Sequence, residues 1–405
     1  MKKISLVFVL FLFIGCSEKE DGQEKIRIQV QSGDLNRVKS IVSVDSLSLK
    51  AGVNYVLQDT EERIIPAQRN GDVIAFSING LPANDSILFE LIESDSFKEK
   101  STKINFKEDA VELSNSSGSP GFQYRTGVGG LDQNIVDEVF YRGGYLHPLF
   151  TPNGRSITEH YTENRPHQNG IWTGWFKTEW NGLKPDFWSQ AEQTGKVEVV
   201  TINRIETGPV YGELETTHHF NEKITGNNST IISDAWKVRY YNNLEINGRP
   251  INVIDLNVVQ TNISEHPFRL IEHVYGGIGF RGSDDWLGEG KMDFITSEGE
   301  SRAEAHKSKA KWVGMSGQID GKKASIIILA HSDNVRFPEP VFINQREPFF
   351  TFAPLQEGDL ILYPSEHFKA KYRYIIMDGN LPSTEIIENY WRDYTNPMTT
   401  QIIIQ

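Results

Sequence analysis

Apolar and polar residues alternate with a period of two along several short segments near the N-terminus. The clearest examples are residues 26–30, 73–78 and 87–92. Clusters of Asn, Asp, Gly and Pro between these segments favour turns. Because successive side chains of a strand point to opposite faces of a sheet, the alternation predicts half-buried β-strands. Residues 24–113 are therefore expected to form a small β-sandwich domain.

The remainder of the chain contains longer apolar runs that are rich in β-branched residues. They occupy residues 197–200, 212–220, 251–259, 325–330 and 371–377. β-Branched side chains suit a pleated, buried surface, so these runs predict a large antiparallel β-sandwich over residues 121–405. The predicted fold class is accordingly all-β.

Two further segments complete the predicted organisation. Residues 114–120 are rich in Ser, Gly and Asn, a composition typical of a flexible linker between domains. Residues 383–394 are the one fair helix candidate, with Ser383 as the N-cap and acidic residues near the positive end of the helix.

The N-terminus has the pattern of a secretory signal. Lys2 and Lys3 precede an apolar run over residues 4–14, which is too short to span a bilayer. A small residue precedes Cys16, the single cysteine of the chain, as in a bacterial lipobox. We expect residues 1–16 to hold a lipoprotein signal peptide and lipobox, with Cys16 as the lipid attachment site. The alternative is an ordinary signal peptide with an incidental cysteine.

An acidic tether over residues 17–23 follows this signal. It resembles the export signal of surface lipoproteins in the Bacteroidetes, and the alternative is a solvated linker. The expected location is the outer membrane, with the lipid anchor holding the chain at the outward face.

Composition narrows the classes of function further. The chain has 405 residues and a net charge of −13, which argues against general nucleic-acid binding. One cysteine excludes internal disulfides and cysteine-rich zinc sites. The sequence has no Walker loop, nucleophile elbow or H-E-x-x-H motif. The G-x-G-x-x-G pattern at residues 277–282 opens no apolar-periodic helix, so a dinucleotide site is not expected.

The segment over residues 145–188 carries the most chemical information, because it combines imidazoles with four tryptophans. These are Trp172, Trp175, Trp180 and Trp188. Indole faces pack well against the C–H faces of sugar rings, so the segment favours carbohydrate binding. The alternative is that the tryptophans belong to the core.

Three motifs within this segment, in this order, resemble the PmoA-like proteins. Residues 145–154 read Tyr-x-x-Pro-Leu-x-Thr-Pro-x-Gly, residues 166–172 read Pro-His-x-x-Gly-x-Trp, and residues 186–188 read Asp-Phe-Trp. Further similar segments extend the resemblance over about 125 to 385. It implies a β-sandwich of the supersandwich type and a role in polysaccharide breakdown. The family includes oligosaccharide dehydratases that act on terminal uronic acids, as with ulvan-type oligosaccharides.

The chain departs from that family at one motif. Relatives typically carry Asp-His-Pro-His-His-Arg-Gly, whereas residues 164–170 here read Asn-Arg-Pro-His-Gln-Asn-Gly. Only His167 of the histidine cluster is present, and His147 stands where Tyr is more usual. A shared histidine metal site is therefore not expected. No cofactor and no metal ligand is assigned, although a divalent metal held by His167, His273, His331 and a Glu such as Glu272 stays open.

Dehydration of a terminal uronic acid removes the C5 proton and the C4 hydroxyl group. It needs a base, an acid and a cationic partner for the carboxylate. We expect His167, His273 and His331 to be the catalytic residues. Arg281 is the expected carboxylate clamp, because a guanidinium binds a carboxylate as a bidentate fork. The other candidate substrate-binding residues are Tyr145, His147, Trp172, Trp175, Asn334 and Arg336.

Rival functions stay open at this point. They are a glycoside hydrolase, a mutarotase or epimerase-like enzyme, and a non-catalytic surface glycan-binding lipoprotein. A hydrolase would need two facing carboxylates, for which several residues, Glu159 among them, offer material. Of His218 and His219, one is expected to point inward. The remaining histidines are expected at the surface or in turns: His160, His266, His306 and His367.

Overall fold

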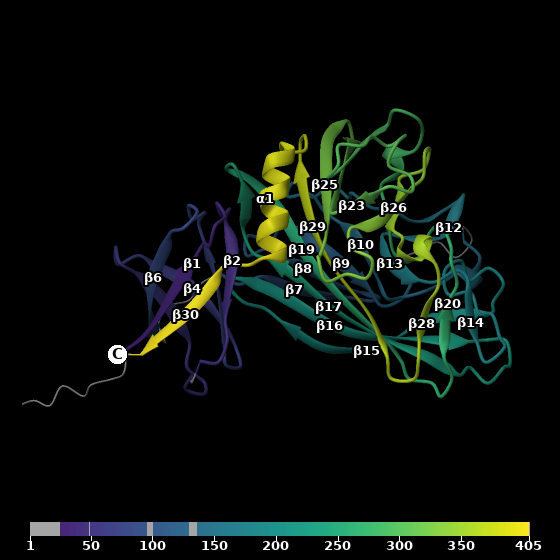
Figure 1. The fold of residues 1–405 in the computed structure, drawn as a ribbon, viewed down its shortest axis with the longest axis horizontal. Coiled ribbons are helices and arrows are strands. Elements are labelled where there is room, and N and C mark those ends of the chain that lie inside the picture. The colour runs from purple at the N-terminus through teal and green to yellow at the C-terminus, as the bar shows by residue number, and fades with distance from the viewer. Residues whose placement is uncertain (1–24, 48, 95–99, 129–135, 405) are drawn as a thin grey trace, which may run out of the picture.

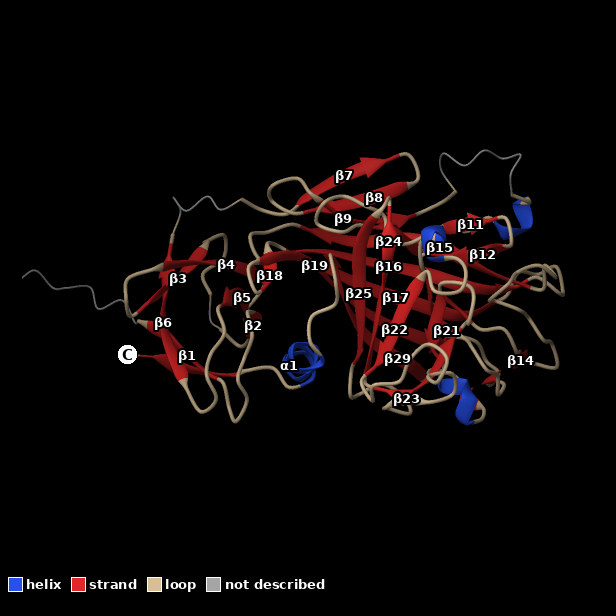
Figure 2. Ribbon diagram, turned by 90° about the horizontal axis from the view of Figure 1, so that it is seen from above, coloured by secondary structure: helices blue, strands red, loops and turns tan. Residues whose placement is uncertain are grey.

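The computed structural model describes residues 25–47, 49–94, 100–128 and 136–404, and it is almost entirely β (Figure 1). The predicted all-β class is confirmed. A smaller unit lies at one end of the molecule and a larger sandwich at the other, with helix α1 (Thr384–Thr395) between them (Figure 2). Within the described residues, no helix has the length and apolar character needed to cross a bilayer. The predicted signal peptide, Cys16 and the acidic tether lie outside the described residues.

The small unit is a seven-stranded antiparallel sheet with its own apolar core. Phe76 and Phe89 meet edge to face in that core, with ring centroids 5.4 Å apart. In spatial order the strands are β2 (Ser40–Val44), β5 (Val73–Ile78), β4 (Ile64–Asn70), β3 (Tyr55–Asp59), β6 (Ser86–Glu93), β1 (Ile26–Gln31) and β30 (Thr399–Ile404).

The boundary between the two units differs from the predicted one. Strands β7 (Lys103–Lys107) and β8 (Ala110–Ser114) belong to the large sandwich, so the chain changes units between β6 and β7. Residues 114–120 form a tight turn between β8 and β9, in which the Ser119 amide donates to the Asn115 side chain. Small polar residues suit turns as well as linkers, and only strand pairing separates the two. The last strand, β30, returns to the small unit beside β1.

Two nine-stranded sheets form the large sandwich. The first sheet contains β23 (Lys309–Ala310), β26 (Glu339–Ile343), β27 (Phe349–Phe352), β21 (Gly277–Arg281), β13 (Ile171–Gly174), β10 (Tyr145–Leu149), β9 (Pro120–Arg125), β8 and β7. The second contains β15 (Gly195–Glu206), β16 (Tyr211–Glu222), β17 (Thr230–Tyr241), β19 (Arg249–Asn262), β29 (His367–Asp378), β25 (Lys322–Ala330), β24 (Trp312–Ile319) and β22 (Met292–Thr296), with β18 (Leu244–Ile246) paired to β19.

Several short strands and turns lie outside the two nine-stranded sheets. They are the hairpin β11 (His160–Thr162) and β12 (Arg165–Asn169), the three-stranded sheet β14 (Thr178–Trp180), β20 (Phe268–Leu270) and β28 (Leu360–Leu362), and the 3-10 turns η1 (Glu138–Phe140), η2 (Asp284–Trp286) and η3 (Pro354–Glu357). The predicted helix is confirmed as α1, whose N-cap Ser383 accepts a hydrogen bond from the Ile386 amide. It packs its apolar residues against strands of both units.

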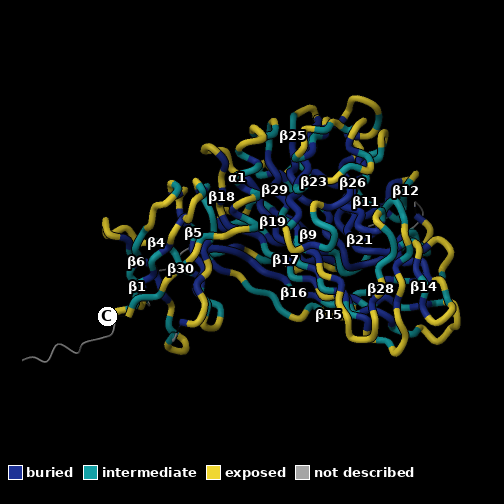
Figure 3. Tube along the Cα trace, in the orientation of Figure 1, coloured by how far each residue is buried: buried dark blue, intermediate teal, exposed yellow. Residues whose placement is uncertain are grey.

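Much of the strand backbone of the large sandwich is coloured as buried in Figure 3. The four tryptophans of residues 145–188 belong to buried apolar clusters of this sandwich. Trp172 and Trp175 are both 0% exposed. The ring of Trp172 lies over Gly279, where an added Cβ would sit 2.7 Å from the indole. The glycines at residues 277–282 therefore allow large rings to pack against the backbone. A dinucleotide site was not expected at this pattern, and packing is the role that the structure gives to these glycines.

A buried polar network joins the two sheets. Asp234 on β17 accepts hydrogen bonds from Thr173 on β13 at 2.8 Å and from the Trp236 indole at 3.0 Å. His218 lies 3.2 Å from the same carboxylate oxygen, and its Nε2 is 2.8 Å from the Tyr124 hydroxyl. Of the His218–His219 pair, His218 is fully buried and His219 is half-buried, as the alternation predicts.

A second buried carboxyl makes stability depend on pH. Glu339 accepts hydrogen bonds from Asn334 Nδ2 at 2.8 Å and from the Tyr372 hydroxyl at 2.9 Å. Burial nevertheless raises the pKa of Glu339 from 4.5 to about 7. The folded state therefore binds this proton more tightly than the unfolded state does. Its contribution to the free energy of unfolding falls as pH rises from 4.5 through 7.

We predict that Glu339→Gln removes this pH dependence. The amide carbonyl still accepts from Asn334, and the amide NH₂ can donate to the Tyr372 oxygen. The variant should gain about 2–3 kcal/mol over the wild type at pH 8 and little at pH 4. Urea unfolding at both pH values measures this difference, with Glu289→Gln at an exposed position as the control. Equal pH slopes for the wild type and Glu339→Gln would contradict the prediction.

Candidate functional site

The candidate site lies where the hairpin β11–β12 meets strands β10 and β21. The backbone joins these elements directly. The Gly170 amide donates to the Glu159 carbonyl at 2.8 Å, and the backbone amide of Arg281 donates to the Gly170 carbonyl at 2.7 Å. Gly170 has φ +51°, and an added Cβ would sit 2.0 Å from the Leu146 carbonyl oxygen. Only glycine lets the hairpin pass so close to β10.

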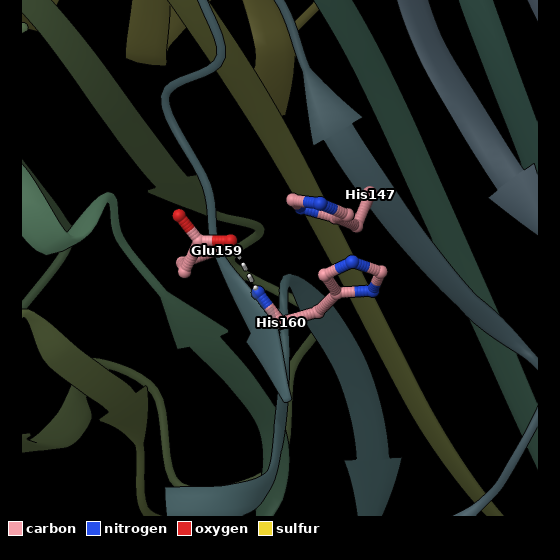
Figure 4. Close-up of side chains that lie close together, drawn as sticks. All are labelled: His147, Glu159 and His160. Atoms are coloured by element: carbon pink, nitrogen blue, oxygen red, sulfur yellow. Dashed lines mark hydrogen bonds between the residues drawn. The ribbon is translucent and has the colours of Figure 1, made fainter. Parts of the chain in front are cut away.

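Three side chains converge at this junction, and we call His147, Glu159 and His160 the imidazole corner (Figure 4). One potential ligand atom from each lies within 4.8 Å of the others. The two imidazole rings stack with centroids 3.9 Å apart at an interplanar angle of 28°. His147 comes from β10 and His160 from β11, so the corner exists only because the hairpin packs beside β10.

Hydroxyl groups fix both imidazoles. His147 Nδ1 lies 3.0 Å from Thr158 Oγ1, which also accepts a hydrogen bond from the Leu149 amide. His160 Nδ1 lies 3.0 Å from the Tyr145 hydroxyl. Tyr145 is fully buried, so it holds the His160 ring from below the surface.

Burial keeps the imidazoles of the corner uncharged. It is the main cause that lowers the pKa of His147 well below its usual value, and His160 and Arg125 add to the effect. The pKa of His160 is lowered to about 4 by burial and then by Arg125. Burial raises the pKa of Glu159, and the negative charges of Asp284 and Asp285 act in the same direction. At neutral pH the corner therefore presents two neutral imidazoles.

Arg125 is the cation that faces the corner. It stands opposite Tyr145 in the pairing of β9 with β10. Its Nη atoms donate to the Gln123 side chain and to the Val128 carbonyl, both at 3.4 Å. The side chain is half-buried, and its positive charge lowers the pKa of both imidazoles.

Arg281 lies beneath the site. Its Nη2 pairs with Asp284 at 2.6 Å and its Nη1 donates to Gln168 at 3.3 Å. It is 0% exposed, so it does not present a free fork to a ligand as the sequence predicted. Its charge partly opposes the rise in the pKa of Glu159 and adds to the lowering of the pKa of His167. Arg281 thus holds neighbouring side chains in place and contributes a buried positive charge close to Glu159 and His167.

His167 lies on β12, in the same hairpin as His160. Its half-buried ring is 6.5 Å from the Phe140 ring, measured between centroids. Burial lowers the pKa of His167 to about 4, with Arg165 and Arg281 adding to the effect. His167 is therefore a neutral imidazole at physiological pH, and it lies close enough to Arg281 for that positive charge to lower its pKa.

The structure does not bring His273 and His331 to this site. His273 packs between Phe176 and Tyr275, with ring centroids 5.0 and 4.4 Å away. His331 lies at the end of β25, against Tyr394 of α1. Within the described ranges, no contact joins either of them to His167. The predicted set of three catalytic histidines is therefore not one cluster: His167 lies on β12, His273 in the loop before β21, and His331 directly after β25.

Four predicted substrate-binding residues are structural instead. Trp172 and Trp175 are fully buried, and the Trp175 indole donates to Gln260 at 2.7 Å. Asn334 is buried and bonded to Glu339. Arg336 donates to backbone carbonyls around η3, including that of Gly358 at 2.7 Å. These side chains are long or polar enough to look functional in a sequence, but their partners are internal.

His160 and Arg125 are the residues that sequence reasoning missed. His160 was expected at the surface or in a turn, yet it stacks on His147. No local pattern reveals this contact, because it depends on the placement of a three-residue strand beside β10. Tyr145 and His147 do belong to the site, as predicted.

Comparisons with known proteins add a family but no activity. Residues 114–392 match a family of unknown function (DUF6807). Among curated proteins, none matches the sequence. A crystal structure of a TPR-domain containing protein from Parabacteroides distasonis aligns with 12% identity and a TM-score of 0.24. That alignment covers 89% of this chain and 56% of the other, so this chain spans little more than half of that protein. We base no argument on so low a score.

We predict that Arg125→Gln raises the pKa of both imidazoles in the corner. Removing a nearby positive charge makes protonation of His147 and His160 easier. A pH titration of the histidine ring protons by NMR measures the change, with the pKa of His160 moving upward from about 4. The pKa of His306, which is lowered by burial and Lys307, should be the same in the variant and in the wild type. An unaltered His160 titration would show that Arg125 does not act on the corner.

Proposed function

We infer the function from the site itself, because the chain belongs to the DUF6807 family, whose function is unknown. We propose that the protein is an oligosaccharide dehydratase, a carbon–oxygen lyase that eliminates water from a uronic acid at a non-reducing end. One observation carries this proposal. The hairpin β11–β12 carries a neutral imidazole, His167, and also His160 of the imidazole corner, whose pKa the positive charge of Arg125 lowers, while the buried Arg281 donates to Gln168 of the same hairpin. The resemblance to the PmoA-like proteins points to the same chemistry.

The proposed reaction needs no oxidant or reductant. His167 takes the C5 proton, and the electron pair of that C–H bond forms the C4=C5 double bond while the C4–O bond breaks. The imidazolium then returns its proton to the departing hydroxyl group, which leaves as water. The products are one water molecule and a 4,5-unsaturated uronyl end. A low pKa suits the second half of this cycle, because it makes the His167 imidazolium a strong proton donor.

The C5 proton becomes acidic only when the substrate carboxylate is neutralised. Arg125 supplies a positive charge beside the imidazole corner, and Arg281 adds a second from below. The whole chain carries a net charge of −13, which repels an anionic substrate at long range. Salt screens that repulsion beyond about 8 Å, so the local arginines dominate at contact distance.

The rival functions have less support. A glycan-binding protein was suggested by the tryptophans, and the two that were expected to contact sugar are fully buried. A hydrolase would need two carboxylates across a cleft. At the corner, Glu159 is accompanied by Asp284 and Asp285, and no geometry among them singles out such a pair. Elimination therefore accounts best for a site in which imidazoles and cations are concentrated.

The proposed setting is the outer membrane, with the chain held by a lipid on Cys16. The signal-like residues 1–16 and the acidic tether support this location. An enzyme anchored there would meet oligosaccharides released outside the cell. A mass measurement on Cys16-containing peptides from the native protein would test the attachment.

We predict that the purified protein removes one water from oligosaccharides that end in a uronic acid. Ultraviolet absorbance should rise through the new double bond, with the mass change followed by mass spectrometry. His167→Ala should lower kcat by about 10²–10⁴-fold, because it removes the base. His367→Ala, at an exposed position outside the site, is the matched control and should keep full activity. A new reducing end without absorbance would replace the proposal by a hydrolase, and no mass change would refute catalysis on uronates.

The pH profile gives an independent check on His167. Its neutral form is the base, and its pKa is about 4 in the folded protein. The value of kcat/KM for the wild type should therefore rise with pH through about 4 and stay level across neutral pH. A rise centred between pH 6 and 7, about the ordinary range of histidine, would contradict this assignment.

A further inference from the structure

The imidazole corner has the ligand set of a metal centre. Two imidazoles and one carboxylate are the donors that catalytic zinc sites and related divalent sites use. Their potential ligand atoms lie within 4.8 Å of one another. In a tetrahedral site with metal bonds of about 2.0–2.2 Å the ligand atoms lie about 3.4 Å apart, so a bound ion would draw these side chains together. Glu159 is half-buried beside the hairpin, and its Oε1 accepts a hydrogen bond from the His160 amide at 3.2 Å (Figure 4), which places the carboxylate next to the imidazoles.

The surroundings of the two imidazoles also fit metal binding. A ligating histidine usually has its other ring nitrogen held by a polar partner, which fixes the ring. Thr158 holds His147 Nδ1 and Tyr145 holds His160 Nδ1, each at 3.0 Å. Among the described residues no hydrogen bond occupies either Nε2. Both rings therefore keep the nitrogen that a metal would need. Because the rings stack at 28°, one ring must turn for both Nε2 atoms to bind the same ion.

The charges around the corner are mixed. Asp284 and Asp285 lie close enough to Glu159 to repel its negative charge, and a bound cation would relieve that repulsion. Arg125 and Arg281 act in the opposite sense. Three protein ligands leave at least one position of a metal ion open. With Arg125 beside it, that position favours an anion as the additional ligand.

We propose that His147, Glu159 and His160 bind one divalent transition-metal ion of the zinc class, with an open position for a carboxylate. The ion would sit on the side of the corner that faces the substrate. The protein would bind this ion whether or not it catalyses the proposed elimination. Its catalytic part, which rests on the proposed function, is to neutralise the uronate carboxylate so that the C5 proton becomes acidic.

Calorimetry with Zn²⁺ on the metal-stripped protein tests the proposal directly. The wild type should bind one ion per chain. His147→Ala and His160→Ala should each weaken binding by about 100-fold or more, and Glu159→Gln, which keeps the shape of the side chain, by about 10-fold or more. His367→Ala is the control and should bind as the wild type does. Absence of a single Zn²⁺ site in the wild type, or unchanged binding in the three variants, would overturn the proposal.

Two additional measurements keep the result clear if a variant folds poorly. Tyr145→Phe removes only the hydroxyl behind His160 and should weaken Zn²⁺ binding by about 10–100-fold, and an unchanged affinity would count against the site. Co²⁺ added to the wild type should give visible absorption bands of low-symmetry coordination, which Glu159→Gln should alter. Zn²⁺ binding without water elimination would leave the metal site standing and refute the dehydratase. Elimination that persists in the metal-free protein would refute the catalytic part of this proposal alone.

Discussion

Arg281, the last residue of strand β21, holds together the part of the first sheet on which the candidate site lies. Its backbone bonds to Gly170 on one side and accepts from Glu159 on the other, which fastens the hairpin β11–β12 to β21. Its side chain is 0% exposed and is paired with Asp284 and Gln168. A buried charge is costly unless it is paired and hydrogen-bonded, so this arrangement tolerates little displacement. The positions of Glu159, His160 and His167 all follow from it.

The rest of the large sandwich supports this part of the first sheet. Asp234 links the two sheets through Thr173, and Trp172 and Trp175 pack against glycines of strand β21. Strand β10 is therefore fixed on both faces when it delivers Tyr145 and His147 to the corner. A site built from imidazoles at hydrogen-bond distance needs such support, because a displacement of about 1 Å would separate the groups.

The sequence predicted the elements better than their assembly. The alternating segments, the β-branched runs and the capped helix all rest on local periods, and they match β1, β5, β6, β19 and α1 closely. The boundary at residues 114–120 failed because a turn and a linker share the same small polar residues. Pairing of β30 with β1 joins the two ends of the described chain, and nothing local announces such a contact.

The candidate site divides in the same way. Tyr145, His147 and His167 were found because they lie in one motif-rich segment. Arg281 was found for its charge, but its role changed because its partners proved to be internal. Trp172 illustrates the limit most clearly, since an indole that suits a sugar also suits a core, and only burial decides. His160 and Arg125 depend on which strands lie side by side, which is a property of the whole sandwich.

The most direct test of the central claim is a crystal structure of the His167→Ala variant with an oligosaccharide that ends in a uronic acid. The account predicts that the terminal carboxylate lies between Arg125 and the imidazole corner, with C5 facing position 167. An oligosaccharide bound elsewhere, for example in the hollow of about 480 Å³ beside His273 and Lys177, would contradict it.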